Sequence, residues 1–133
     1  MNITLGDWLG EEPFGMTLSS GFFGFFAHAG VAFALEQTGH SPVAISGSSA
    51  GALVGAGMAT RIGASRLRDE LFSLERRDFW DPFPGLGLLL GRLFEQKLRS
   101  LMPVLDLSAC ANPFRASVFD VLLGKRWSSV RVI

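Results

Sequence analysis

The pentapeptide Gly47-Ser48-Ser49-Ala50-Gly51 constrains the fold more than any other part of the chain. It follows a strand-like run, Val43–Ser46, and leads into Ala50–Ala59, a run of small and apolar residues typical of a closely packed helix. A sharp strand-to-helix turn strains the serine backbone and crowds the positions two before and two after it, where glycine removes the offending Cβ atoms. Among the neighbouring serines only Ser49 has glycines at both offsets. The pattern predicts a nucleophile elbow over residues 46–52, with Ser49 as the nucleophile of a serine acyl hydrolase.

Such an elbow supplies part of the chemistry that an attacking serine needs. A serine hydroxyl is a poor nucleophile unless a base takes its proton and the negative charge on the substrate oxygen is stabilised. Ser49 would stand at a helix N-terminus, where free N–H groups and the helix dipole favour that charge. The Ala50 N–H is placed to donate to a tetrahedral oxyanion, an interaction worth roughly 3 kcal/mol. The pentapeptide pattern alone also occurs in ordinary Gly/Ser loops. The prediction therefore depends on the strand-like run before it, the helical run after it and the glycine-bearing loop one strand–helix unit upstream.

The N-terminal part of the chain alternates between strand and helix patterns. Met16–Ser20 predicts a short buried strand, and Ala27–Thr38 has apolar residues at helical spacing that end before Gly39. Together with the elements around Ser49 this order favours a parallel sheet. The sequence therefore predicts an α/β fold with three layers, α/β/α, around a mainly parallel sheet. The later predicted elements are helices over 65–77 and 91–102, an irregular connection over 79–91, and strands over 114–121 and 127–133 joined through Gly124-Lys125.

Composition and charge exclude several classes of function. The 133 residues include 12 Lys or Arg and 12 Asp or Glu, and no basic block offers the footprint that nucleic-acid phosphates require. Cys110 is the single cysteine, which excludes an intrachain disulfide and a thiolate metal cluster and favours a small buried side chain. Gly85-Leu86-Gly87 and Gly124-Lys125 lack the surroundings of nucleotide-binding motifs. We expect no nucleic-acid partner, no metal and no cofactor.

The N-terminus favours neither a signal peptide nor a membrane span. Asp7, Glu11 and Glu12 precede the apolar run and no basic residue does, which is unlike a secretory signal. The run Phe14–Leu35 is long enough to cross a bilayer, but glycines, serines and His28 interrupt it. The expectation is a soluble, cytoplasmic chain.

Two sequence blocks in a fixed order carry a family resemblance. The first is SSGFFGFFAHAGV at 19–31, followed by Ala34-Leu35-Glu36, and the second is SGSSAGALVG at 46–55. They resemble, in order, the glycine-rich oxyanion loop with its first helix and the nucleophile elbow of the patatin-like phospholipase family. The strong part of the resemblance covers residues 16–60.

The resemblance implies an oxyanion loop over residues 19–26. Its donors would be the backbone N–H groups of Gly21 and its neighbour Phe22, together with that of Ala50 in the elbow. The family loop has three adjacent glycines followed by a basic residue. Here Gly21 keeps one of those glycines, and Gly24 takes the basic position.

The family uses a Ser-Asp dyad whose aspartate precedes a glycine. None of the six aspartates of this chain is followed by glycine. The resemblance therefore implies that the partner aspartate lies beyond these residues. Residues 1–133 would then be a single partial patatin-like domain, incomplete at its C-terminus and inactive by itself. Asp120 matches a strand-end aspartate that we interpret as structural.

The resemblance implies hydrolysis of carboxylic esters in lipids, of the lipase or phospholipase A type, through an acyl-enzyme on Ser49. Two alternatives stay open. One is acyl transfer to an alcohol other than water, and the other is a catalytically incomplete fragment or lipid-binding module. The expected partners are a lipid or other acyl-ester substrate and, transiently, a membrane surface. The sequence specifies no oligomeric state.

Several other side chains have two interpretations each. His28 would be either a base for Ser49 or a hydrogen-bonded helix residue, and the second is favoured; His40 is expected to be exposed in a turn. A cluster of four phenylalanines would either line an acyl-chain pocket or pack in the core: Phe22, Phe23, Phe25 and Phe26. A second group of apolar residues has two interpretations. It would be a lid or lipid-contacting surface, or it would be a buried connection; its members are Phe79, Trp80, Phe83 and 86–90. Packing is favoured for both groups.

Overall fold

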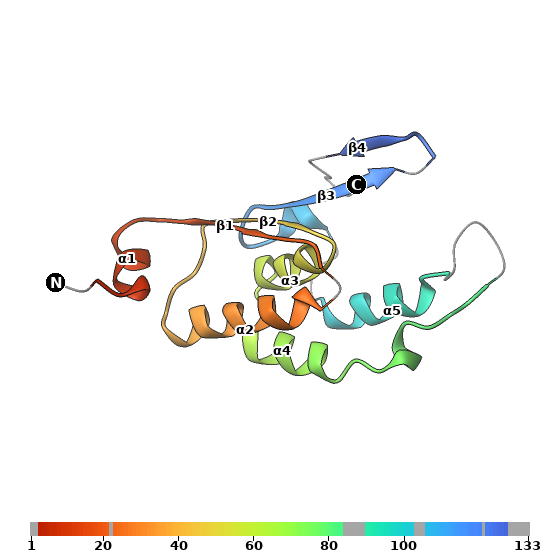
Figure 1. Ribbon diagram of the computed structural model, residues 1–133, viewed down its shortest axis with the longest axis horizontal. Helices are drawn as coiled ribbons and strands as arrows, with labels where there is room; N and C mark the ends of the chain where they lie inside the picture. The colour runs from red at the N-terminus through yellow and green to blue at the C-terminus, as the bar shows by residue number, and fades with distance from the viewer. Residues whose placement is uncertain (1–2, 22, 84–89, 103–105, 121, 128–133) are drawn as a thin grey trace.

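The computed structural model describes residues 3–21, 23–83, 90–102, 106–120 and 122–127 (Figure 1). Its helices are α1 (Leu5–Glu11), α2 (Gly24–Gln37), α3 (Ala50–Ala59), α4 (Ala64–Phe72) and α5 (Arg92–Leu101), with short 3-10 helices η1 (Arg76–Asp78) and η2 (Leu107–Ala109). Its strands are β1 (Gly15–Leu18), β2 (Ala44–Ser48), β3 (Phe114–Asp120) and β4 (Lys125–Trp127). The predicted alternation of strand and helix from β1 to α3 is confirmed.

The four strands pair in the order β1-β2-β3-β4. The first three are parallel: Leu18 pairs with Gly47, and Ser48 pairs with Ser117. β4 runs antiparallel to β3. The carboxyl ends of the parallel strands therefore point toward one side of the molecule, on the right in Figure 1, which we call the carboxyl edge. The predicted α/β fold with a mainly parallel sheet is confirmed.

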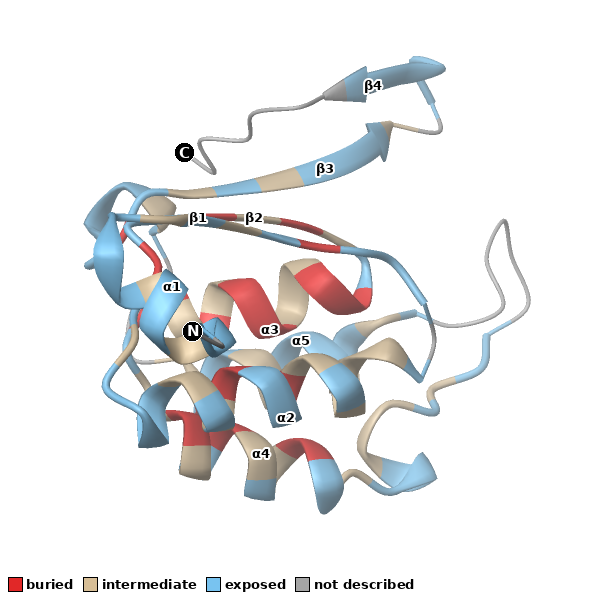
Figure 2. Cartoon of the chain, turned by 60° about the vertical axis from the view of Figure 1, so that its left-hand side comes forward, coloured by how far each residue is buried: buried red, intermediate tan, exposed pale blue. Residues whose placement is uncertain are grey.

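Within the described residues, the helices α2, α3 and α4 lie on one face of the sheet, with α3 directly beneath the strands (Figure 2). The core forms where these layers meet. Val54 of α3 and Leu67 of α4 are its largest fully buried side chains. The remaining members of the core cluster are Leu18, Ala29, Ala32, Ala64, Leu71 and Leu101. Strand alternation leaves Thr17 and Ser46 on the opposite face, where their hydroxyl oxygens are 2.9 Å apart.

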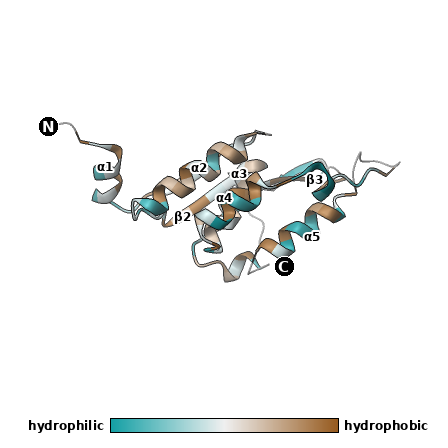
Figure 3. Ribbon diagram, turned by 90° about the horizontal axis from the view of Figure 1, so that it is seen from below, coloured by the Kyte–Doolittle hydropathy of each residue, from teal (hydrophilic) through white to brown (hydrophobic). Residues whose placement is uncertain are grey.

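The amino-acid composition of each helix matches how deeply the helix is buried. α3 consists of small and apolar residues, so it can pack closely against the sheet on one side and against α2 and α4 on the other. α5 instead alternates between apolar and polar residues along its ribbon (Figure 3). Its Leu93 and Leu98 are partly buried, whereas Glu95 and Gln96 are exposed. No helix in the described ranges is long and apolar enough to cross a membrane.

Several boundaries differ from the prediction. α2 begins at Gly24, three residues early, because Gly24 N and Phe26 N already donate to the carbonyls of Gly21 and Phe23. α4 ends at Phe72, and a new turn starts where Glu75 and Asp78 form a capping box. The predicted last strand is described only over Lys125–Trp127, and residues 128–133 lie outside the described residues.

α1 was not among the predicted elements, although Thr4 and Asp7 form a capping box at its start. This helix also corrects the expectation for His40. Its Nε2 donates to the carbonyl of Gly6 at 2.9 Å, and its Nδ1 lies 2.9 Å from the hydroxyl oxygen of Thr38. The ring is therefore half-buried and holds α1 to the end of α2. Cys110 is likewise only partly buried, and burial together with nearby Asp106 raises the pKa of its thiol.

Asp81 caps α5 from a distant part of the chain. Its carboxylate accepts hydrogen bonds from Gly91 N at 3.0 Å and Leu93 N at 3.2 Å. Partial burial works to raise the pKa of Asp81, but these backbone hydrogen bonds outweigh it and hold the pKa below its usual value of 3.8.

We expect Asp81→Ala to lower the Tm by roughly 2–6 °C at neutral pH, because two N–H groups at the start of α5 lose their acceptor. Since the folded-state pKa is lowered, the Tm difference from the unsubstituted chain is complete above pH 3.8 and disappears as the pH falls through the folded-state value. Thermal unfolding followed by circular dichroism at several pH values measures it. Asp69→Ala is the control, since the partner that the structure gives the Asp69 carboxylate among the described residues is neighbouring Arg68, at the surface. An equal loss in both variants would contradict the capping role.

Candidate active site

Ser49 occupies a strained turn between β2 and α3. Its φ is 52° and its ψ is −118°, and the described chain contains one other non-glycine residue with positive φ, Arg61. β2 ends at Ser48, α3 begins at Ala50, and the Ser49 carbonyl accepts the first helical hydrogen bond, from Leu53 N at 3.1 Å. The side chain is exposed and makes no hydrogen bond with a described residue. Ser49 thus presents its hydroxyl at the carboxyl edge of the sheet.

The glycines on either side allow this turn to close. A Cβ atom on Gly51 would overlap the Leu18 carbonyl and would lie 2.7 Å from the Ser19 oxygen. A Cβ atom on Gly47 would overlap the Gly51 carbonyl and would lie 2.6 Å from Ala52 N. These neighbours are backbone atoms, which have no rotamer to adopt. Both positions therefore require glycine for steric reasons, and the Gly51 position requires it because β1 lies against the first turn of α3.

The loop after β1 lies beside this turn. The pairing of Leu18 with Gly47 brings the ends of β1 and β2 together, and Ser19 lies close to Gly51. Gly21 has φ 152°, a conformation that L side chains rarely adopt, and its carbonyl accepts from Gly24 N at 2.8 Å. The described loop is shorter than the predicted range 19–26, since α2 begins at Gly24. Phe22, the second predicted loop donor, lies outside the described residues.

His28 fastens this loop to α2. Its Nε2 donates to the Ser19 carbonyl at 2.9 Å, since a carbonyl oxygen accepts only. The predicted role of a hydrogen-bonded helix residue is therefore confirmed. A nitrogen that holds its proton against Ser19 is not free to take one from Ser49.

The aromatic residues around the loop divide between core and surface. Phe25 packs against the core, and its ring lies 4.1 Å from that of Phe26. Phe26 in turn contacts Phe72 of α4, edge to face, with ring centroids 4.8 Å apart. Phe23 is 73% exposed. The contribution of Phe72 was missed from the sequence, because nothing local to α4 indicates that its end lies beside the start of α2.

No aspartate forms a hydrogen bond with Ser49 within the part of the chain that the structure describes. All six are among the described residues, and each is engaged near its own position in the chain or at a helix cap. Their hydrogen-bond partners are Thr4 for Asp7, Arg68 for Asp69, Glu75 N for Asp78, Gly91 N and Leu93 N for Asp81, Ser108 for Asp106, and Leu122 N and Leu123 N for Asp120. Asp120, the aspartate at the end of β3, uses one carboxylate oxygen for both amides.

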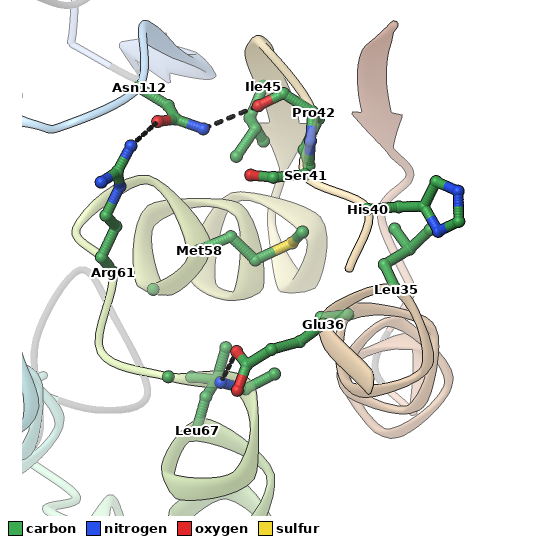
Figure 4. A pocket seen from close by; sticks show the side chains of 14 residues that line it. Leu35, Glu36, His40, Ser41, Pro42, Ile45, Met58, Arg61, Leu67 and Asn112 are labelled. Atoms are coloured by element: carbon green, nitrogen blue, oxygen red, sulfur yellow. Dashed lines mark hydrogen bonds between the residues drawn. The ribbon is translucent and has the colours of Figure 1, made fainter. Parts of the chain in front are cut away.

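A partly open pocket of about 350 Å³ lies between α2, α3 and α4 (Figure 4). It adjoins Met58 and Arg61, at the end of α3 opposite Ser49. Two of its polar side chains already have partners: the Glu36 carboxylate accepts from Ala64 N, and Asn112 donates to the Pro42 carbonyl. Arg61 donates to Asn112 at 3.5 Å. The pocket is therefore separate from the Ser49 turn. In the described residues, no three His, Cys, Asp or Glu side chains gather as metal ligands would.

Comparison with known proteins identifies the family. A family model described as patatin-like phospholipase matches residues 16–130, which include the loop after β1, the Ser49 turn and β3. A search of curated proteins gave no significant match. The match covers most of the 133 residues. The chain belongs to the patatin-like phospholipase family.

Proposed function

We propose that this polypeptide supplies the nucleophile for hydrolysis of carboxylic ester bonds of lipids, which proceeds through an acyl-enzyme formed on Ser49. The observation that carries the proposal is the positive φ of Ser49 at a strand-to-helix turn that only glycine neighbours allow. Such a turn holds the hydroxyl clear of the sheet and fixes its direction, which an attacking serine requires. Membership of the patatin-like family supports a lipid ester as the substrate class.

In the proposed reaction, Ser49 Oγ attacks the ester carbonyl carbon, and its proton passes to a base. The negative charge that develops on the carbonyl oxygen is stabilised by backbone N–H groups. The Ala50 N–H at the start of α3 is one donor, because the first amides of a helix have no acceptor within it. Gly21 and Phe22 of the adjacent loop are the proposed others. The base returns this proton to the departing alkoxide, which leaves as the alcohol, and the acyl group stays on Ser49. Water then attacks the acyl carbon and gives a proton through the base to Ser49 Oγ, which releases the carboxylic acid and restores the serine.

We place the base of the proposed Ser-Asp dyad outside these 133 residues, because no aspartate here is followed by glycine and none forms a hydrogen bond with Ser49 within the described residues. General base catalysis contributes roughly 10²–10⁴-fold to such reactions. Turnover by these residues alone is therefore expected to be slow by about that factor. An activated ester, whose leaving group needs no proton, is still expected to acylate Ser49.

The acceptor of the acyl group is tested by isotope labelling. We expect incubation with p-nitrophenyl butyrate in ¹⁸O-labelled water to add one butyryl group to the chain, followed by slow release of butyric acid carrying labelled oxygen. Mass spectrometry of the protein and of the acid measures both steps. Butyryl glycerol as the main product when glycerol is added would instead establish the acyltransferase alternative. A chain that is never acylated, yet binds the ester, would establish a lipid-binding module and would contradict the proposed hydrolysis.

A further inference from the structure

The β3–β4 hairpin exposes leucine side chains at the carboxyl edge. Leu122 is 89% exposed and Leu123 is 61% exposed, the first being the most exposed of the large apolar side chains in the described residues. On the adjoining end of β3, Phe119 is 58% exposed. Figures 1 and 2 show this hairpin projecting away from the helices. Contiguous exposed apolar groups of this kind are typical of a surface that contacts another phase or molecule.

The fold holds this turn in shape. The amides of Leu122 and Leu123 both donate to Asp120 Oδ1, each at 3.0 Å, and Gly124 supplies the positive φ of 61° that leads into β4. The leucines are therefore presented on a hydrogen-bonded turn and not on an unconstrained loop. An apolar pair on an ordered turn loses little conformational entropy when it inserts into an apolar phase.

Cations flank the leucines. Lys125 and Arg126 follow after Gly124, both are exposed, and neither forms an ion pair with a described acidic residue. The one acidic residue from Phe114 to Trp127 is Asp120, whose carboxylate is occupied by the turn. The chain as a whole has zero net charge, so this local excess of positive charge is a property of the hairpin. Exposed leucines beside unpaired cations are complementary to a layer that is apolar inside and carries anionic groups at its surface.

We propose that Leu122, Leu123, Lys125 and Arg126, the hairpin tip, dock the protein on anionic lipid bilayers. The leucines insert among the acyl chains, and the two cations contact lipid phosphates. This inference rests on the proposed function, since it brings Ser49, at the same edge of the sheet, toward lipid substrate. A second copy of the chain is a poorer occupant, because the four exposed apolar side chains that the structure describes on this hairpin, which are Val118, Phe119, Leu122 and Leu123, fall short of the roughly 1,200 Å² of total buried surface that a stable protein interface needs.

Vesicle flotation of the Ser49→Ala protein tests the docking without interference from hydrolysis. The probes are vesicles of phosphatidylcholine alone and of an equimolar mixture with phosphatidylglycerol. We expect L122S/L123S to weaken binding to both kinds by about tenfold or more, from the lost burial of two leucine side chains. K125Q/R126Q should weaken binding to the anionic vesicles by roughly twentyfold and leave binding to phosphatidylcholine unchanged. High salt should reproduce the second effect with the unsubstituted hairpin.

Leu5→Ser is the matched control, because Leu5 is 69% exposed on α1, at the opposite side of the molecule in Figure 1. Its vesicle binding should not change. Unchanged binding in L122S/L123S, or an equal loss in Leu5→Ser, would overturn the proposal. So would a protein that sediments as a dimer until the leucines are replaced, since the tip would then contact a second copy.

The proposed function is tested by a separate measurement. This is the acylation of protein that retains Ser49 by soluble p-nitrophenyl butyrate. Acylation without vesicle binding would overturn the docking alone. Vesicle binding without acylation would overturn the proposed function alone. L122S/L123S is expected to keep the circular dichroism spectrum and the acylation rate of the unsubstituted chain, because the exposed leucines support no packing.

Discussion

Gly51→Ala is expected to destabilise the fold by about 3 kcal/mol or more, the largest effect on stability that we predict for a single methyl group. The added Cβ would overlap the Leu18 carbonyl and would lie 2.7 Å from the Ser19 oxygen, so α3 would have to move away from β1. Small domains are stable by only about 5–15 kcal/mol in total. Urea denaturation followed by circular dichroism measures the change.

The matched control is Gly30→Ala, in the exposed middle of α2, where an added Cβ would meet nothing within 4 Å. That substitution should stabilise the chain by roughly 0.5–1 kcal/mol, because alanine is the better helix former. Equal behaviour of the two variants would mean that Gly51 is an ordinary helix glycine and that the turn at Ser49 is not closed by contact with β1.

Ser49→Ala is expected to abolish acylation of the chain by p-nitrophenyl butyrate and to reduce release of p-nitrophenolate to the uncatalysed rate, because no hydroxyl remains at this position to carry the acyl group. The variant removes the proposed nucleophile and leaves the backbone donors in place. It should also be at least as stable as the unsubstituted chain, since the exposed Ser49 side chain makes no hydrogen bond with a described residue. Stopped-flow release of p-nitrophenolate under single-turnover conditions gives the rate.

Ser117→Ala is the control for this variant, because Ser117 is an exposed serine on β3 that pairs in register with Ser48. Its acylation rate should stay within about twofold of the unsubstituted chain, since surface substitutions away from a site have small effects. An undiminished rate in Ser49→Ala would mean that another residue is acylated.

The elements nearest Ser49 could be predicted because their signals are local. A strand pattern, two glycines at fixed offsets and a small-residue helix indicate β2, the turn and α3 without reference to the rest of the chain. The reason that Gly51 must be glycine is not local, however, since the crowding atoms belong to Leu18 and Ser19. The sequence pattern indicated the requirement, and the structure supplies its cause.

Features that depend on distant contacts could not be predicted. The half-buried position of His40 follows from its hydrogen bond to Gly6, which belongs to a helix that was not predicted. The hydrogen bond from Gly91 N, at the start of α5, to Asp81, ten residues earlier, cannot be recognised from the local sequence pattern. The exposure of Leu122 and Leu123 could not be predicted either, because they lie in the connection between two predicted strands, where the sequence pattern does not specify burial. Tertiary packing decided each of these outcomes.

The central claim, that Ser49 is the nucleophile, is tested most directly by finding where an active-site reagent attaches. The chain would be treated with a fluorophosphonate, digested, and its modified peptide sequenced by mass spectrometry. We predict a single phosphonylated residue, Ser49, and no labelling in the Ser49→Ala variant. A phosphonyl group on Ser46 or Ser48, or labelling that is equally strong after Ser49→Ala, would contradict the claim.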